Sequence, residues 1–251
     1  HRDLHSFPTR RSSDLILLDT IMGAEVVLKK DDGGDPALQS AETIAAVKAR
    51  YEAAGEVVYE IPVGGSNTVG LMGYYDCAEE ITAQAKEMGL EDATVVTGVG
   101  STGTYMGLFC GLLNEHSPLK LLGIAISPFT EEKEQRVMDL FHQAKQEYGY
   151  TVDVTPEDFH IEKGYTRGAY NNPHPAVREA IYRMARAEAI ILDPCYTGKM
   201  FAGLLEMIAE GKIKKGEKLI LLHTGGMPGL YTKHHRVELE KDLLPMVTIL
   251  D

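Results

Sequence analysis

The sequence has no tryptophan, few cysteines and an excess of acidic over basic residues. Its three cysteines, Cys77, Cys110 and Cys195, lie in apolar stretches without the spacing of a metal site or a disulfide framework. This predicts free, buried thiols in a reducing compartment and no metal centre. The 25 Lys and Arg against 37 Asp and Glu leave a net charge of -12, which argues against nucleic acid or an anionic membrane surface as a partner. No apolar run is long enough to span a membrane, so we expect a cytoplasmic protein.

The rest of the composition is that of a globular protein, because 44% of the residues are hydrophobic and 25% are charged. From residue 16, apolar strands alternate with amphipathic helices, which predicts an α/β fold with open, mostly parallel sheets and helices on both faces. The expected strands are Ala24–Leu28, Val57–Ile61, Ala93–Thr97, Leu121–Ile126, Ala189–Leu192 and Leu219–Leu222. Among the expected helices, one is capped by Ser40, one spans Glu131–Tyr148 and one opens at Pro175.

The first 15 residues do not follow this alternation. They are basic and serine-rich, without periodicity and without the apolar core of a signal peptide. The string from His5 to Leu15 resembles the translation of a sequencing-library adapter. We therefore interpret residues 1–15 as a non-native tail, with a native disordered tail as the alternative, and expect the natural protein to begin upstream.

A glycine-rich turn at Gly98–Thr104 joins the expected strand at 93–97 to a helix. Glycines let a backbone approach a ligand closely, and a helix that begins at such a turn offers free N–H groups to an anion. The hydroxyls of Ser101, Thr102 and Thr104 add hydrogen-bond donors. We expect the turn to hold a phosphate group, with an ordinary strand-to-helix connection as the alternative.

Two nucleotide sites fit this turn less well. Gly98, Gly100 and Gly103 match the dinucleotide pattern G-x-G-x-x-G, but the next strand ends in Ser127-Pro128 without the acidic residue that would bind a ribose. No lysine follows Gly103, as a nucleoside-triphosphate loop would require. The hydroxyl-rich turn suits one compact phosphate better than a pyrophosphate.

Three other turns follow expected strands in the same way, at Gly64–Asn67, Tyr196–Lys199 and His223–Gly226. In an open parallel sheet, such turns gather at the carboxyl edge of the strands, where ligands bind. We expect these three turns and Gly98–Thr104 to meet at one site.

Four strings at these turns resemble one family of pyridoxal-phosphate enzymes, the family of D-cysteine desulfhydrase and 1-aminocyclopropane-1-carboxylate deaminase. They are Ile61-Pro-Val-Gly-Gly-Ser-Asn67, Gly100-Ser-Thr-Gly-Thr104, Leu192-Asp-Pro-Cys-Tyr-Thr-Gly-Lys199 and His223-Thr-Gly-Gly226. The resemblance implies a tryptophan-synthase-β type of fold (fold type II), with two α/β domains and the cofactor between them. It places residues 16–59 in a remnant of the smaller domain and residues 60–251 in the larger, cofactor-binding domain. It also implies a small amino-acid substrate and a homodimer.

The resemblance assigns roles to individual residues. Five would hold the phosphate of pyridoxal 5'-phosphate: Gly100, Ser101, Thr102, Gly103 and Thr104. Thr224 would face the pyridine nitrogen, where a partner tunes the electron demand of the ring. Tyr165 and Tyr196 would flank the substrate as catalytic phenols. For Tyr165 the alternative is a core tyrosine with a bonded hydroxyl.

Thr197 bears on the reaction, and we assign it to the cofactor site. The deaminase carries glutamate at this position and leucine at that of Thr224, so threonine at both resembles the desulfhydrase. That activity is β-elimination of D-cysteine to hydrogen sulfide, pyruvate and ammonia. A deaminase or a lyase acting on cysteate is the alternative.

The family's Schiff-base lysine, in a Gly-Gly-Asn-Lys string, does not occur here. Lys29 and Lys30 are interpreted as a solvated charge run, and Lys199 matches a lysine with another role. We therefore expect a C-terminal part of an enzyme, inactive alone. His223 is expected to bond locally, and His234-His235 to lie in a polar tail without metal.

Two functions of other classes stay open at this point. One is an NAD-dependent oxidoreductase that uses Gly98–Gly103, against which the strand end at Ser127 counts. The other is a non-catalytic module that binds phosphate ligands.

Overall fold

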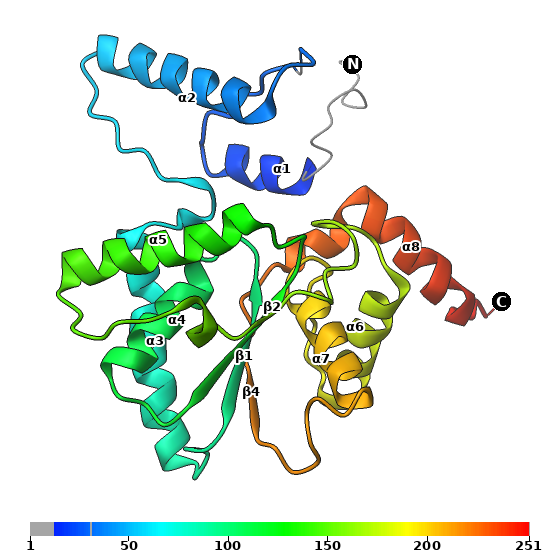
Figure 1. The fold of residues 1–251 in the computed structure, drawn as a ribbon. Coiled ribbons are helices and arrows are strands. Elements are labelled where there is room, and N and C mark those ends of the chain that lie inside the picture. The colour runs from blue at the N-terminus through cyan, green and yellow to red at the C-terminus, as the bar shows by residue number, and fades with distance from the viewer. Residues whose placement is uncertain (1–12, 31, 251) are drawn as a thin grey trace. The chain divides into compact units, whose positions relative to one another are not determined.

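A computed structural model describes residues 13–30 and 32–250, which form parts of two compact units, residues 1–61 and 62–251 (Figure 1). The tail expected at residues 1–15 falls mostly on residues 1–12, which lie outside the described part. The domain boundary expected between residues 59 and 60 lies close to the division between the units. The assignment of residues 16–59 to a remnant of a smaller domain stays a prediction.

The first unit contains two helices, α1 (Ser13–Ile21) and α2 (Pro36–Ala53). α2 begins earlier than expected, because Asp35 rather than Ser40 caps it by accepting hydrogen bonds from the N–H groups of residues 37 and 38. The strands expected at Ala24–Leu28 and Val57–Ile61 are wrong, since both segments are irregular. Their apolar side chains are largely exposed, and no described strand pairs with them. An apolar run becomes a strand only where a neighbour accepts its backbone hydrogen bonds.

The second unit is built on a parallel sheet, and the α/β class expected from the sequence is confirmed. Its described strands are β1 (Thr94–Val99), β2 (Lys120–Ala125), β3 (Ile161–Glu162) and β4 (Leu219–Leu221). They lie in the order β3-β2-β1-β4. β1 pairs along its whole length with β2, from Thr94 opposite Lys120 to Val99 opposite Ala125. The strand expected at Ala189–Leu192 is irregular, and β3 falls in a region expected to be a loop.

Helices cover both faces of this sheet (Figure 1). They are α3 (Thr68–Glu87), α4 (Gly103–Asn114), α5 (Glu131–Tyr148), α6 (Pro175–Glu188) and α7 (Thr197–Ala209). A further helix, α8 (Lys233–Leu243), follows the last strand. The ends of α5 and the start of α6 are those expected. Side chains alternate along β1, so Val95 and Val99 pack with α3, α4 and α5 while Val96 packs with α7.

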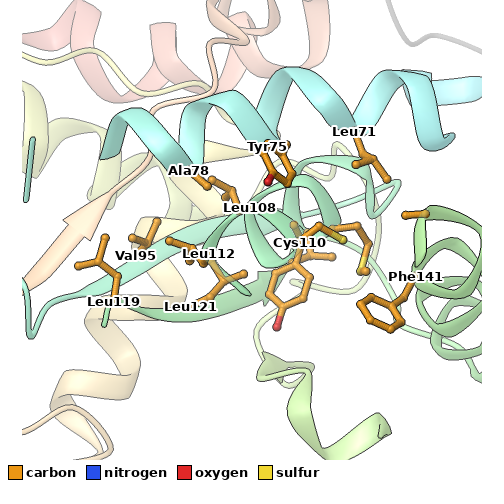
Figure 2. Close-up of a cluster of buried hydrophobic side chains, with 14 of the residues drawn as sticks. Leu71, Tyr75, Ala78, Val95, Leu108, Cys110, Leu112, Leu119, Leu121 and Phe141 are labelled. Atoms are coloured by element: carbon orange, nitrogen blue, oxygen red, sulfur yellow. The ribbon is translucent and has the colours of Figure 1, made fainter. Parts of the chain in front are cut away.

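The largest of the three hydrophobic clusters in the described residues lies between α3, α4 and the sheet (Figure 2). Leu71 and Ala78 from α3 meet Leu108 and Leu112 from α4 there, and Phe141 of α5 closes the cluster. The burial of these side chains positions α4, and with it the glycine-rich turn from which α4 begins. Cys110 and Cys195 are buried and Cys77 is half-buried, and all three are free thiols, as expected.

The C-terminal segment expected to be a polar tail is the helix α8, and His235 on this helix is only 1% exposed. The expectation is wrong because polar contacts, and not an apolar stripe, hold the helix: Asp242 accepts from Arg178 and Tyr182 of α6, and His235 contacts Asn171. Within the described residues, no helix is long and apolar enough to cross a membrane. The same residues contain no cluster of three or more metal-ligating side chains.

Candidate active site

A pocket of about 210 Å³ lies at the carboxyl ends of the strands in the second unit. It is lined by Gly64, Tyr74, Gly98, Val99, Gly100, Ser101, Thr102, Thr104, Tyr105, Tyr196, Thr224 and Gly226. All four turns singled out in the sequence contribute to this lining, so their expected convergence is confirmed. Among the described residues, every one that lines the pocket is uncharged.

The turn after β1 forms the floor of an anion site. α4 begins at Gly103, so its first backbone N–H groups face the turn with the positive end of the helix dipole. Thr102 precedes it in a left-handed conformation, with φ of 80°, and its side chain does not cap the helix. The Thr102 hydroxyl is buried and has no hydrogen-bond partner in the described structure. A buried donor of this kind is costly unless a ligand satisfies it.

The turn at Gly64, which precedes α3, packs against this site. The Ser66 hydroxyl donates to the Ser101 hydroxyl at 2.7 Å, which leaves the proton of Ser101 free to donate. Gly64 has φ of 74°, and a Cβ at this position would lie 2.3 Å from the Ser101 Oγ. Only glycine allows the two turns to approach this closely. The site thus presents hydroxyls, helix N–H groups and glycine backbone, a donor set that fits the phosphate of pyridoxal phosphate.

Tyr196 reaches the pocket from a turn that Asp193 organises. The buried Asp193 carboxylate accepts from the N–H groups of Cys195, Tyr196 and Thr197 at 2.7–2.8 Å. It also accepts from the Thr197 hydroxyl at 2.6 Å. Thr197 is buried within this network and does not line the pocket, unlike the other residues expected to hold the cofactor through side chains.

Thr224 also lines the pocket, from the turn after β4. Gly226 of the same turn packs on Asp193, since a Cβ there would lie 2.6 Å from the Asp193 Cγ. His223 bonds locally, as expected: its ring contacts the Ile191 carbonyl oxygen at 2.9 Å and accepts from the Gly225 N–H at 3.2 Å. The buried Asp193 side chain therefore contacts both turns: it accepts hydrogen bonds in the turn of Tyr196 and packs against Gly226 in the turn of Thr224.

The structure does not bring Tyr165 to Tyr196. The Tyr165 hydroxyl donates to Glu210 at 2.6 Å and accepts from Lys212 at 2.8 Å. Both partners follow α7, whereas Tyr196 precedes it, and 13 helical residues at 1.5 Å each separate these ends by roughly 20 Å. Tyr165 is 4% exposed and packs in the core cluster that contains Val96. Its environment is therefore that of a core tyrosine with a bonded hydroxyl, which was the alternative considered for it.

A second tyrosine in the same segment, Tyr170, contacts Tyr196 without lining the pocket itself. The hydroxyl of Tyr170 contacts that of Tyr196, and the two rings lie 5.6 Å apart at 72°. Burial, followed by hydrogen bonds with Cys195 and Tyr196, raises the pKa of Tyr170 far above its ordinary value. Tyr170 is thus neutral at physiological pH. The sequence offered two tyrosines five residues apart and no local signal to choose between them.

Lys199 is fully buried beside this pair and engaged with backbone oxygens. Its ammonium donates to the carbonyls of Ile126 at 2.9 Å and Thr166 at 3.2 Å, and also to that of Ala169. Burial lowers its pKa. These bonds agree with the interpretation that Lys199 has a role other than carrying the cofactor. Lys29 and Lys30 are exposed, and Lys29 pairs with Glu42 at 3.1 Å.

Comparisons with known proteins match this architecture. D-cysteine desulfhydrase of Yersinia enterocolitica is 37% identical over 224 residues, which are 88% of this chain and 64% of that protein. A Pyrococcus abyssi protein, provisionally named 1-aminocyclopropane-1-carboxylate deaminase, is 35% identical over 215 residues, 86% of this chain and 63% of that protein. The chain thus spans slightly less than two thirds of these relatives.

A solved structure of a homologue of 1-aminocyclopropane-1-carboxylate deaminase has a TM-score of 0.77 and 31% identity to this chain. The match covers 90% of this chain and 66% of that one. The family model described as pyridoxal-phosphate dependent enzyme matches residues 6–225. The pocket has the donors that the cofactor's phosphate needs, and the match extends over three of the turns that build it and as far as Gly225 in the fourth. The chain belongs to the family of pyridoxal-phosphate dependent enzymes.

Proposed function

We propose that this chain is part of a pyridoxal-phosphate-dependent lyase of the D-cysteine desulfhydrase type. The reaction is D-cysteine plus water to hydrogen sulfide, pyruvate and ammonia. The observation that supports it best is the uncharged pocket that joins a phosphate-type turn, Tyr196 and Thr224, with Tyr170 in contact with Tyr196. The relatives named D-cysteine desulfhydrase support the same choice.

The residues present can be assigned to the parts of this reaction. The N–H groups and hydroxyls of Gly100–Thr104 would hold the cofactor phosphate, and Thr224 would face the pyridine nitrogen. The bound cofactor supplies an electron sink for the negative charge that develops on the substrate's α-carbon. Tyr196, hydrogen-bonded by Tyr170, would hold or move a proton at its phenolic oxygen next to the substrate.

Thr197 favours the desulfhydrase over the deaminase for a reason that its contacts supply. Its hydroxyl both donates to Asp193 and accepts from the Asp193 N–H. A glutamate at this position would place a second carboxylate against the first, and like charges repel strongly in a buried site. We infer that the Asp193 network selects a neutral residue at position 197. Deamination of 1-aminocyclopropane-1-carboxylate and sulfur release from cysteate are alternative outcomes of the assay.

Other features of the whole enzyme stay proposals. We propose that the lysine carrying the cofactor lies outside these 251 residues, because Lys199 is committed to three carbonyls. We also propose a cytoplasmic homodimer that acts on a small amino acid, without a nucleic-acid or membrane partner. The acidic net charge of -12 is the support for the last point.

The cofactor assignment is tested by equilibrium binding of pyridoxal phosphate to the chain, with inorganic phosphate as competitor. We expect Thr102→Gly, which keeps the left-handed backbone but removes the hydroxyl, to weaken binding about tenfold. Thr97→Val is the matched control, because Thr97 is buried outside the pocket lining. No binding at millimolar cofactor would overturn the assignment.

The reaction is tested with the full-length product of the reading frame that encodes this chain. D-cysteine, 1-aminocyclopropane-1-carboxylate and cysteate are offered separately, and sulfide, ammonia and sulfite are measured. Sulfide from D-cysteine alone is the expected result. Ammonia from the cyclopropane substrate without sulfide from D-cysteine would replace the desulfhydrase by the deaminase.

A further inference from the structure

The segment from Thr166 to Asn171 is held by side chains of two helices, and one of these contacts is the ion pair of Arg167 with Glu206 of α7. Lys199 at the start of α7 binds the carbonyl oxygens of Thr166 and Ala169. His235 of α8 binds the side chain of Asn171, with 2.8 Å between Nε2 and Oδ1. Tyr170, which contacts Tyr196 in the pocket, lies between these anchors.

His235 is suited to a directional contact. It is 1% exposed, and burial, helped by nearby His234, Lys199 and Arg178, lowers its pKa to about 4. The ring is therefore neutral at physiological pH and carries a single N–H. The Asn171 oxygen can only accept, so that N–H must be on Nε2.

Asn171 occupies a position where the backbone has little freedom. Its φ is 55°, in the left-handed region that asparagine enters more readily than most side chains. The turn at Asn171 directly follows Tyr170 and sets the direction in which the Tyr170 side chain leaves the backbone. Anchoring the Asn171 amide to α8 therefore fixes the orientation of Tyr170.

We propose that His235 is a positioning residue: through Asn171 it holds Tyr170 against Tyr196, so that the C-terminal helix α8 completes a pocket that it does not line. The positioning concerns this chain's own residues, and its effect on turnover rests on the proposed function.

Three variants separate this role from general packing. His235→Leu removes the donor, His235→Gln keeps a neutral donor, and His234→Leu changes the adjacent ring while leaving the Asn171 contact in place. Hydrogen–deuterium exchange of residues 166–172 is compared with that of α4 in the same samples. We expect His235→Leu to speed exchange in residues 166–172 at least tenfold and to leave α4 within twofold. His235→Gln and His234→Leu should match the wild type.

Turnover of D-cysteine by the full-length product gives the second readout. We expect His235→Leu to lower kcat about tenfold with a smaller change in KM, and His235→Gln to restore it. If the wild type releases no sulfide while exchange responds as described, the proposed function fails and the positioning role stands. Wild-type exchange and turnover in His235→Leu would overturn the positioning role.

If His235→Leu does not fold, Asn171→Gly tests the positioning role instead. Glycine keeps the left-handed backbone and removes only the acceptor. It should reproduce the faster exchange of residues 166–170, and the double variant with His235→Gln should be no worse than Asn171→Gly alone, since the two side chains act as one contact. Additive effects of the two changes, or unchanged exchange in Asn171→Gly, would contradict the proposal.

Discussion

The turn at Gly98–Thr104 and the segment Tyr165–Asn171 lie close to the same pocket but are specified in different ways. The turn is made by consecutive residues that join β1 to α4, and its binding groups are backbone N–H groups and three hydroxyls. The second segment is irregular, and its conformation depends on Lys199 and His235, which follow it by about 30 and 64 residues.

This difference explains which residues the sequence identified. The conformation of a contiguous turn is determined by its own residues, so a phosphate-binding role could be predicted from Gly100, Ser101 and Thr102 alone. Tyr165 and Tyr170 have no such local distinction. Only the anchors on either side of Tyr170 turn it toward Tyr196, while Tyr165 points to Glu210. We therefore expect substitutions that alter backbone geometry to disrupt the turn, and substitutions of distant anchoring residues to disrupt the segment.

The largest effect is expected where the turn at Gly64 touches Ser101. Gly64→Ala combines a left-handed backbone with a Cβ 2.3 Å from the Ser101 Oγ, and we expect a loss of about 3–4 kcal/mol in the free energy of unfolding. Gly65→Ala is the control: its φ is also positive, at 61°, but no atom lies within 4 Å of its Cβ. It should cost only about 1–2 kcal/mol. Denaturant titration and cofactor binding are measured for both variants. Equal losses of stability would show that the close approach of Gly64 to Ser101 does not contribute to the effect.

The next effect distinguishes the two tyrosines. Tyr170→Phe removes the hydroxyl that contacts Tyr196, and we expect kcat for the proposed lyase to fall about 100-fold, as for loss of a proton-handling partner. Tyr165→Phe should keep kcat within about twofold and the free energy of unfolding within about 1 kcal/mol, because its hydroxyl bonds only Glu210 and Lys212 outside the pocket. The opposite ranking would restore Tyr165 as the catalytic phenol.

A smaller loss is expected when the anchor on α7 is removed. Lys199→Met keeps the length of the side chain but leaves three backbone carbonyls without their donor. Hydrogen bonds to a charged group are worth more than neutral ones, but the buried ammonium also costs desolvation, so we expect a net loss of about 2 kcal/mol. Lys133→Met, which removes bonds to Ser127 and the Pro128 carbonyl at a more exposed site, should cost less than half as much. Equal thermal stability of Lys199→Met and the wild type would contradict the anchoring role.

The smallest effect appears only in acid and concerns the anchor on α8. The folded-state pKa of His235 is about 4, below its ordinary 6.5, so the folded protein binds this proton less well than the unfolded chain. The stabilisation is complete above pH 6.5 and is lost as the pH falls from 6.5 toward 4. Between pH 7 and pH 5 the loss is roughly 2 kcal/mol. Burial also lowers the pKa of His174, which acts in the same direction.

The contribution of His235 is therefore measured as the difference between two pH profiles of unfolding free energy, wild type and His235→Gln. The variant keeps His174 and loses only the titration at position 235. We expect the two profiles to diverge in slope between pH 6.5 and 4 and to run parallel above pH 7. Parallel profiles throughout would mean that His235 is not held neutral.

The secondary-structure predictions also succeeded where the signals are local and failed where distant contacts decide. The helix Glu131–Tyr148 was predicted with both ends and the helix from Pro175 with its correct start, because caps and periodicity lie within the segments themselves. The apolar runs at Ala24–Leu28 and Ala189–Leu192 read as strands but are irregular, because pairing with a neighbour is not encoded in the run. α8 was missed since a buried histidine and bonds from Asp242 to α6, rather than an apolar stripe, hold a helix that is otherwise polar.

The sequence by itself determined the α/β class, the four turns that meet at the pocket and the phosphate-type character of Gly98–Thr104. Each of these depends on residues within a few positions of one another, where backbone preference, capping and glycine content act. Only the tertiary structure decided that Tyr170 and not Tyr165 meets Tyr196, that Thr197 serves Asp193, and that His235 is buried. Those outcomes depend on which donors and acceptors from distant segments share the interior, and a buried polar group must find its partner there because water cannot supply one.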